Sequence, residues 1–240
     1  MKFALVGNCS YQALISDTAR VAWLCWPRFD SSFVFGELVA GERGGEMSIA
    51  PAAGEFSTTQ RYISHTAIVE TRFQSIDGDF QVIDFAPRFL QYERSFRPTM
   101  LVRIIRPLTG TPRVKAVCRP VYDYGATEPG SYLASNHIEW ILPRAKLRLT
   151  TNAPLTYVHE GRPFALDRPI YLVLAWGQPL EAGLEETCES FAARTRRYWQ
   201  TWVRHCALPA ELQDEVIRSA ITLKLHQYED TGAITAAATT

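Results

Sequence analysis

Up to Gly177 the chain consists of short apolar runs separated by turn-forming residues. The runs are rich in β-branched and aromatic side chains, and Gly, Pro, Asn and Asp interrupt them at short intervals, which is typical of a large sandwich or barrel. No segment before Pro179 keeps the ~3.6-residue period of a helix for more than two turns, so the crossover helices of a parallel sheet are not expected. The pattern predicts a mainly β fold, a large antiparallel β-sandwich, with strands at Val21–Trp26, Leu101–Leu108, Val114–Val121, Glu139–Leu142, Lys146–Thr150, Leu155–His159 and Ile170–Trp176.

The clearest local unit is a hairpin that joins Ile68–Ser75 to Phe80–Phe85. More apolar and more polar positions alternate in its first arm, so one face of this strand is suited to burial. Asp77-Gly78 supplies the positive φ values that a two-residue type I′ turn requires. A tight closure of that turn is expected to place Phe73 opposite Val82.

After Pro179 the spacing of apolar residues becomes helical. Steps of four and three residues separate Leu184, Cys188, Phe191, Thr195, Tyr198 and Trp202, which predicts one stripe of an α-helix. Glutamates gather at the start of this segment and arginines toward its end, so each group complements the nearer pole of the helix dipole.

A second helix is predicted to have Pro209 in its first turn and Gly232 at its C-terminal end. Its apolar stripe is expected to comprise Leu212, Val216, Ala220 and Leu223. No later element in the sequence covers this stripe, so the β domain, a partner or a continuation of the chain must do so. We expect a longer chain, and without it residues 210–240 are expected to be mobile, disordered or self-associated through the exposed helix.

Composition and charge exclude several classes of protein. With 240 residues, 47% hydrophobic and 21% charged, the chain can fill a core, which excludes global disorder. Twenty-five basic and 25 acidic residues balance, so nucleic-acid binding is not expected. No apolar stretch reaches the ~20 residues of a membrane span, and the start of the chain lacks a signal-peptide pattern, so we expect no membrane contact and a cytoplasmic location. Five scattered cysteines without a C-x-x-C pair indicate buried thiols rather than disulfides or a zinc site.

Five segments, in order along the chain, carry a family resemblance. They are Leu5–Ile15, Trp23–Ser31, Glu70–Phe73 with Asp77-Gly78 and Asp84-Phe85, Arg119–Gly125, and Thr231–Thr240. The second matches W-x-C-x-P-R-F-D-S, the fourth is similar to R-P-x-F-D-Y-G, and the last to T-G-A-I-V-A-A-P-T-T, with Ala238 in place of the proline. Together they resemble the bacterial and archaeal branch of glycoside hydrolase family 15, the glucoamylase, glucodextranase and trehalase-like enzymes.

The resemblance implies an N-terminal β-sandwich, a helical linker and a catalytic barrel of six α-helical hairpins. We therefore expect a sandwich domain at residues 1–178, a linker at 179–208 and the first barrel helix at 209–240. In that family the glucose-clamping Trp-Arg-Asp segment and both catalytic glutamates lie beyond the position that matches Thr240. The implied function is the non-catalytic N-terminal part of an inverting hydrolase of α-glucosides that uses no metal or cofactor, with the barrel as its partner in cis. The 240-residue chain alone is then expected to be inactive.

Pro27–Ser31 is the best candidate for a functional segment. It follows a predicted strand and places the guanidinium of Arg28 and the carboxylate of Asp30 two positions apart in a loop. Such groups can bind sugar hydroxyls with charge-assisted hydrogen bonds. The alternative is that they pair with each other or cap the neighbouring backbone. Tyr122 and Asp123 could similarly form a sugar platform, or could pack in a sheet.

Other constellations have structural explanations. Asp77 with Asp79 fits turn chemistry, and Glu185 with Glu186 fits the helix dipole. Trp199 and Trp202 are expected to be buried along the first helix. The five histidines form no i, i+4 pair, so no metal site is expected, and the motifs of nucleotide binding and acyl transfer are missing. The alternative to a hydrolase portion is a stand-alone carbohydrate-binding or protein-interaction β-sandwich module.

Overall fold

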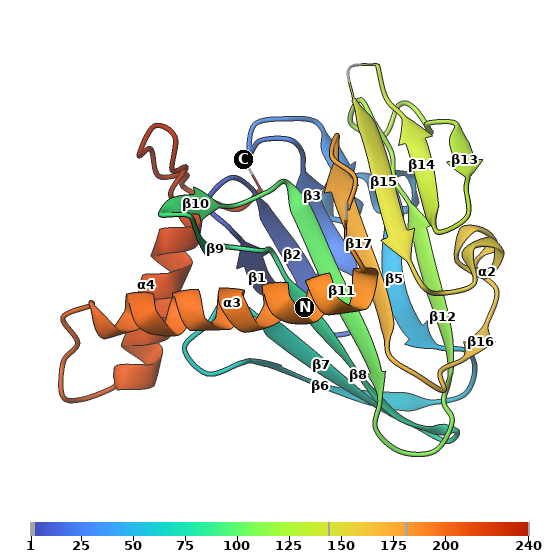
Figure 1. Ribbon diagram of the computed structural model, residues 1–240, viewed down its shortest axis with the longest axis horizontal. Helices are drawn as coiled ribbons and strands as arrows, with labels where there is room; N and C mark the ends of the chain where they lie inside the picture. The colour runs from blue at the N-terminus through green and yellow to red at the C-terminus, as the bar shows by residue number, and fades with distance from the viewer. Residues whose placement is uncertain (1–2, 144, 181, 240) are drawn as a thin grey trace.

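The computed structural model describes residues 3–143, 145–180 and 182–239. In these ranges the chain forms β-sheets followed by two long helices (Figure 1). Every pairing between the strands is antiparallel, which confirms the predicted fold class. None of the helices described is long and apolar enough to cross a membrane.

An eight-stranded sheet forms one layer of the molecule. In spatial order its strands are β13 (Ser131–Leu133), β14 (His137–Ile141), β15 (Lys146–Thr151), β17 (Ile170–Trp176), β11 (Met100–Pro107), β8 (Gly78–Phe85), β7 (Val69–Ser75) and β6 (Phe56–Tyr62). Both arms of the predicted hairpin lie in this sheet as β7 and β8.

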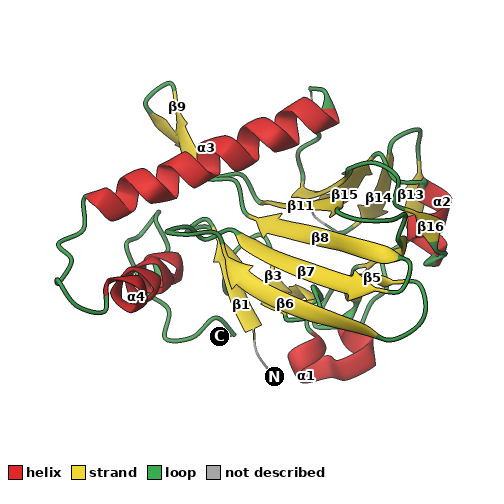
Figure 2. Ribbon diagram, turned by 90° about the horizontal axis from the view of Figure 1, so that it is seen from below, coloured by secondary structure: helices red, strands yellow, loops and turns green. Residues whose placement is uncertain are grey.

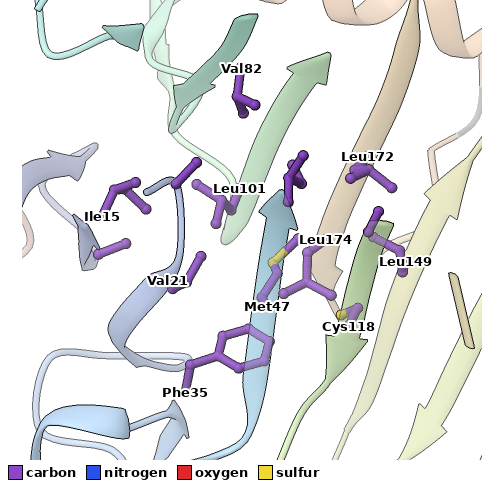
Figure 3. Packing of buried hydrophobic residues seen from close by; sticks show 14 of the residues in the cluster. Ile15, Val21, Phe35, Met47, Val82, Leu101, Cys118, Leu149, Leu172 and Leu174 are labelled. Atoms are coloured by element: carbon purple, nitrogen blue, oxygen red, sulfur yellow. The ribbon is translucent and has the colours of Figure 1, made fainter. Parts of the chain in front are cut away.

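Two smaller sheets pack on one face of the large one. The first consists of β1 (Phe3–Gly7), β2 (Gln12–Ser16), β3 (Val21–Cys25) and β4 (Phe33–Phe35), and the second of β16 (Phe164–Ala165), β12 (Arg113–Arg119) and β5 (Glu46–Pro51). Two short helical turns, α1 (Glu37–Ala40) and η1 (Gly41–Gly44), connect β4 to β5. Figure 3 shows Ile15 and Phe35 from the first small sheet, Met47 from the second, and Leu101 and Leu174 from the large sheet gathered in one apolar core.

The opposite face of the large sheet is covered by helix α3 (Leu184–Arg204), which runs along it in Figure 2. Ile83, Val102 and Val173 belong to a second buried cluster with Cys188 of this helix. Strands β11 and β17 are therefore buried on both faces, which explains why Met100–Ile105, apart from Arg103, and Ile170–Trp176 are continuous apolar runs rather than alternating ones.

An ion pair lies inside the sandwich and was not predicted. Arg103 and Asp84 face each other across β11 and β8, and both side chains are fully buried. Arg103 Nε donates to Asp84 Oδ1 at 2.6 Å, and Nη2 donates to the carbonyl oxygen of Ala19 at 2.5 Å. The Met47 carbonyl accepts a longer bond at 3.4 Å. Because a buried charge without partners is costly, this arginine ties all three sheets to a single arrangement.

The hairpin of β7 and β8 exists, but its predicted register is wrong. Phe73 pairs with Phe80, and their rings stack at 4.6 Å, whereas Val82 pairs with Thr71. The turn is not at Asp77-Gly78, because Gly78 already pairs with Ser75 as the first residue of β8. Gly78 has φ +135°, and a Cβ there would lie 2.2 Å from the carbonyl oxygen of Thr109. This glycine therefore permits a close backbone approach from the next turn rather than forming the hairpin loop.

The strand predicted at Leu155–His159 is wrong, since the segment forms a short helix, α2 (Leu155–Glu160). The backbone amides of Tyr157 and Val158 both bond to the carbonyl of Pro154, so the segment satisfies its hydrogen bonds locally and needs no neighbouring strand. Gly161, in the left-handed conformation, ends the helix.

Helix α3 confirms the first predicted helix and its stripe. Cys188 and Thr195 are buried, and the other stripe residues are partly buried against the sandwich or the second helix. Trp199 is fully buried, as expected, and Trp202 packs beside it.

The second helix, α4 (Gln213–His226), differs from its prediction in three ways. Pro209 lies before the helix, and Gly232 lies in a later turn rather than at the helix end. The buried face consists of Ile217, Ile221 and Leu225, which pack on Leu5, Trp199 and Val203, so the β domain and α3 cover this face. Of the predicted stripe, Leu212 and Leu223 are turned outward, 71% and 64% exposed, and Val216 and Ala220 are only partly buried. Two apolar stripes exist on this helix, and the sequence pattern does not rank them.

Candidate functional site

The Pro27–Ser31 loop follows β3 on the surface. Arg28 and Asp30 pair with each other in two hydrogen bonds, Nε to Oδ1 at 3.1 Å and Nη2 to Oδ2 at 2.9 Å. Ser31 Oγ accepts from the Arg28 amide at 3.2 Å. The pairing between the two side chains was one of the two predicted alternatives. Because both are more than half exposed, the pair contributes little stability and both groups remain accessible to a ligand.

The same loop contacts the segment that follows α4. The ring of Tyr228 lies 5.8 Å from that of Phe29 in an edge-to-face arrangement, and the guanidinium of Arg28 lies 5.6 Å from the Tyr228 ring centre. A hydrogen bond to Asp230 raises the pKa of the Tyr228 hydroxyl. The pKa of Asp230 is lowered, chiefly by a hydrogen bond from Arg97 and then by one from Tyr228. The predicted loop and the C-terminal segment therefore form one surface.

Arg88 and Arg97 hold this C-terminal segment against the β-sandwich, and we name the contacts of Arg88 and Arg97 with Glu229 and Asp230 the ionic latch. Arg88 pairs with Glu229, and Arg97 pairs with Asp230. The latch also includes a main-chain bond from the Glu229 amide to the Cys9 carbonyl at 3.0 Å. The latch therefore joins the β1–β2 turn and the segment after α4 to Arg88, just before β9 (Phe89–Gln91), and to Arg97, just after β10 (Arg94–Phe96).

Arg88 is the buried member of the ionic latch, with its side chain only 4% exposed. Its Nη1 donates to the Asn8 carbonyl at 2.7 Å, and its guanidinium lies 4.8 Å from the ring centre of Tyr198. Burial by itself lowers the pKa of Arg88, but the neighbouring Cys9, Tyr198 and Glu229 outweigh it and raise the pKa. This guanidinium is therefore a permanent positive charge that needs the Glu229 carboxylate.

The Tyr122–Gly125 loop lies next to the Pro27–Ser31 loop. The Tyr124 amide donates to Ser32 Oγ at 2.8 Å, and the Tyr124 ring packs edge-on against Phe33 at 5.9 Å. Asp123, Tyr124 and Gly125 have consecutive positive φ values of 53°, 54° and 82°, a strained conformation of the kind that clusters at functional sites. Tyr122 is half-buried against the core and Asp123 is exposed. Tyr124, 64% exposed, is the accessible ring of this loop.

Two of the four other acidic residues considered from the sequence, Asp79 and Glu185, have side-chain partners. Asp79 accepts from Arg72 at 2.8 Å, and Glu185 accepts from the Tyr171 hydroxyl at 3.3 Å. Among the residues that the structure describes, no group of three or more His, Cys, Asp or Glu side chains is placed to hold a metal ion.

Sequence reasoning missed the ionic latch. Arg88 and Glu229 are 141 positions apart, and Arg97 and Asp230 are 133 apart. No local period or motif links residues so distant, so only a three-dimensional structure can pair them. The one available signal was that Asp230 directly precedes Thr231, the first residue of a segment singled out by its resemblance.

Comparisons with known proteins show which family the sequence resembles. The family described as trehalase-like, N-terminal, matches residues 1–134. A trehalase of Mycolicibacterium smegmatis is 29% identical over 272 residues, covering 99% of this chain and 39% of that protein. A trehalase of Mycobacterium tuberculosis is 30% identical, with 99% of this chain and 39% of its own length covered. Trehalase 1 of Sulfolobus acidocaldarius is 30% identical, with 98% and 39% covered. The chain thus spans about two fifths of the length of these relatives.

Proposed function

The chain belongs to the trehalase-like N-terminal family, and we propose that it is the non-catalytic N-terminal portion of a hydrolase that cleaves an α-glucoside such as trehalose. The observation that carries the proposal is the alignment itself. Nearly all of this chain matches proteins named trehalases, but the match covers only 39% of the length of each of the three relatives. The other 61% of each relative has no counterpart in the 240 residues. A hydrolase of this kind needs a carboxylic acid to protonate the leaving oxygen and a carboxylate to activate water. The resemblance assigns both to the part beyond Thr240.

We propose the division 1–178 for the sandwich, 179–208 for the linker and 209–240 for the first helix of the catalytic barrel. The outward face of α4 supports this division. Leu212, Leu223 and the nearby Ile234 are each more than 60% exposed. Burying such a side chain contributes about 1.5–3 kcal/mol, so this face is suited to packing against further helices of the barrel.

Arg28, Asp30, Tyr122 and Asp123 are proposed to line the rim of the sugar cleft. Their support is the contact between the Pro27–Ser31 loop and Tyr228, because the segment after Tyr228 leads into the proposed catalytic part. At such a rim the Arg28–Asp30 pair could exchange one of its mutual hydrogen bonds for a sugar hydroxyl.

The parent reaction is proposed to proceed with inversion. The two carboxyl groups would then stand ~6.5–9.5 Å apart, with room for water between them, and the attacked unit of an α-glucoside would be released as β-glucose. The role of the present chain in that reaction is to support the barrel and to contribute loops to its rim.

The test compares the 240-residue chain with the polypeptide encoded when the natural reading frame is followed beyond Thr240. Proton NMR of trehalose hydrolysis is expected to show α- and β-glucose appearing in equal amounts with the longer polypeptide, because inversion acts only on the attacked unit and the departing glucose keeps its α configuration; retention would give α-glucose alone. No product is expected with residues 1–240. In the longer polypeptide, Arg28→Ala is expected to raise KM for trehalose, while Arg113→Ala, at an exposed arginine that begins β12, leaves it unchanged. Trehalose hydrolysis by purified residues 1–240, free of contaminating glucosidase, would refute the proposal. A reading frame that stops at Thr240, together with sugar affinity in calorimetry, would establish a carbohydrate-binding module instead.

A further inference from the structure

A groove of about 360 Å³ lies between β9 and the C-terminal half of α3. Its lining consists of Phe89, Leu90, Arg194, Arg197, Tyr198, Thr201, Trp202 and His205. Figure 2 shows β9 on the outer side of α3, away from the large sheet. The floor of this groove is aromatic and its rim is basic. Tyr198 also faces Arg88 of the ionic latch and Trp202 also packs on Trp199, whereas Arg197 takes no part in the contacts described above. We name this groove the β9–α3 groove.

One wall of the β9–α3 groove is the short β9–β10 hairpin, which aromatic contacts hold against α3. Strands β9 and β10 (Arg94–Phe96) have three residues each, too few to be stable as an isolated ribbon. Phe89 and Phe96 stack at 4.7 Å, and both rings pack against Phe191 of α3 at 5.3 Å. The groove wall is therefore preorganised, which lowers the entropic cost of binding.

Arg194 completes this attachment. Its guanidinium lies 3.8 Å from the centre of the Phe89 ring, and its Nη2 donates to the Leu90 carbonyl at 3.1 Å. The outer side of the hairpin nevertheless remains apolar and open, with Leu90 64% and Tyr92 91% exposed. Exposed apolar side chains on a fixed element are typical of an interaction surface.

The charge around the groove is one-sided. Residues 190–210 include four arginines and one histidine but no aspartate or glutamate, in a chain whose net charge is zero. Arg196, Arg197 and Arg204 are exposed, and none of the ion pairs between described residues involves them. A partner that complements this surface must carry carboxylates beside an apolar side chain.

We infer that the β9–α3 groove binds an acidic segment of the catalytic part of the same polypeptide. A large apolar side chain of that segment fills the space between Phe89, Tyr198 and Trp202, and its carboxylates pair with Arg197 and Arg204. A tethered segment is favoured over a separate partner because its effective concentration is high, and Thr201–His205 form the last turn before the chain continues to α4. This inference rests on the proposed function, since it requires a catalytic part in cis.

Hydrogen exchange measured by mass spectrometry tests the inference on the 240-residue chain and the longer natural polypeptide. Amides of residues 89–96 and 197–205 are expected to exchange about 10-fold more slowly in the longer polypeptide. Arg197→Glu combined with Arg204→Glu is expected to remove this difference, and salt is expected to weaken it. Arg168→Glu, a single charge reversal on the connection between β16 and β17, is the control for each arginine taken singly and is expected to leave the difference unchanged.

The outcomes separate this inference from the proposed function. Equal exchange in the two chains, with trehalose hydrolysis by the longer one, overturns the groove assignment and leaves the proposed function intact. Slower exchange in a longer polypeptide that hydrolyses neither trehalose nor other α-glucosides such as maltose supports the groove and removes the proposed function. Protection that rises with protein concentration in the 240-residue chain overturns the inference, because a second copy is then the occupant.

Discussion

Replacing Glu229 by alanine is expected to release the segment after α4 while the sandwich stays folded. The carboxylate of Glu229 is the acidic partner of Arg88, whose side chain is 4% exposed. The Nε of Arg88 already has no hydrogen-bond partner among the described residues. Without Glu229 the Arg88 guanidinium keeps its contacts with the Asn8 carbonyl and the Tyr198 ring. It loses the carboxylate that balances its charge, and only water can then take the place of that carboxylate.

The magnitude follows from burial. Removing one member of a buried ion pair costs about 3–5 kcal/mol, because the remaining charge is left uncompensated. The Glu229 side chain is 27% exposed, so water can replace it in part and the lower limit, about 3 kcal/mol, applies. A loss of ~1.4 kcal/mol is tenfold in an equilibrium constant, so the opened segment becomes roughly 100-fold more populated.

Hydrogen exchange can measure this opening at main-chain hydrogen bonds of the segment. The amides of Glu229, Gly232 and Thr235 donate to Cys9, Tyr228 and His226 at 3.0, 2.8 and 2.9 Å, respectively. Their exchange is expected to accelerate roughly 100-fold in Glu229→Ala, while amides of β7 and β8 keep their rates, because local opening leaves the sandwich intact.

Asp230→Ala is the matched control. Its ion pair with Arg97 is half-exposed, so its loss is expected to cost less than about 1 kcal/mol and to accelerate exchange by less than about fivefold. Glu229→Gln should lie between the two, since its amide oxygen can still accept from Arg88. If Glu229→Ala accelerates exchange no more than Asp230→Ala, the buried charge does not hold the segment and the reasoning fails.

Three further predictions concern the sandwich and the thiols. Gly78→Ala is expected to lower the free energy of unfolding in urea by about 3 kcal/mol, because the new Cβ would lie 2.2 Å from the Thr109 carbonyl oxygen and Gly78 has φ +135°. Gly130→Ala is the control, since a Cβ there would have no atom within 4 Å, and it should change the free energy by less than about 0.5 kcal/mol. Similar effects of the two substitutions would contradict the close-approach argument. A hydrogen bond from Lys146 is the main cause that lowers the pKa of Glu139 below 4.5, so this carboxylate stabilises the fold above that pH and the stabilisation is lost as pH falls through the lower folded pKa. Glu139→Gln should therefore reduce the unfolding free energy near about pH 7 but not near about pH 2, and an equal reduction at both would exclude the linkage. Iodoacetamide is expected to label half-buried Cys206 before Cys25, whose burial raises its pKa to about 12, and mass spectrometry that finds Cys25 labelled first would contradict this order.

Side-chain spacing alone was sufficient for the antiparallel sandwich and for α3. The predicted strands of the large sheet are found because β-branched and aromatic runs fit a buried sheet whatever their neighbours are. Helix α3 spans 21 residues, long enough for its stripe from Leu184 to Trp202 to exclude a strand. The six residues of α2 are too few for either period to be distinguished, which is why the strand predicted there is wrong.

Contacts between distant segments account for the remaining differences. The register of β7 and β8 depends on the Thr109–Gly110 backbone that approaches Gly78, and α4 buries Ile217 rather than Val216 because Trp199 and Leu5 are on that side. The Pro27–Ser31 loop could be found from its own residues, because Arg28 and Asp30 are two positions apart. The contact of this loop with Tyr228 and the ionic latch could not be found in this way, because their residues are far apart in the sequence.

The amino-acid order of this chain therefore decides which segments become strands and helices, because burial preference and period are local properties of a sequence. The folded molecule decides which face each helix buries, which residues oppose each other across the sheet, and that Arg88 meets Glu229. Those choices depend on the free energy of whole packed surfaces, in which residues separated by more than a hundred positions act on one another directly.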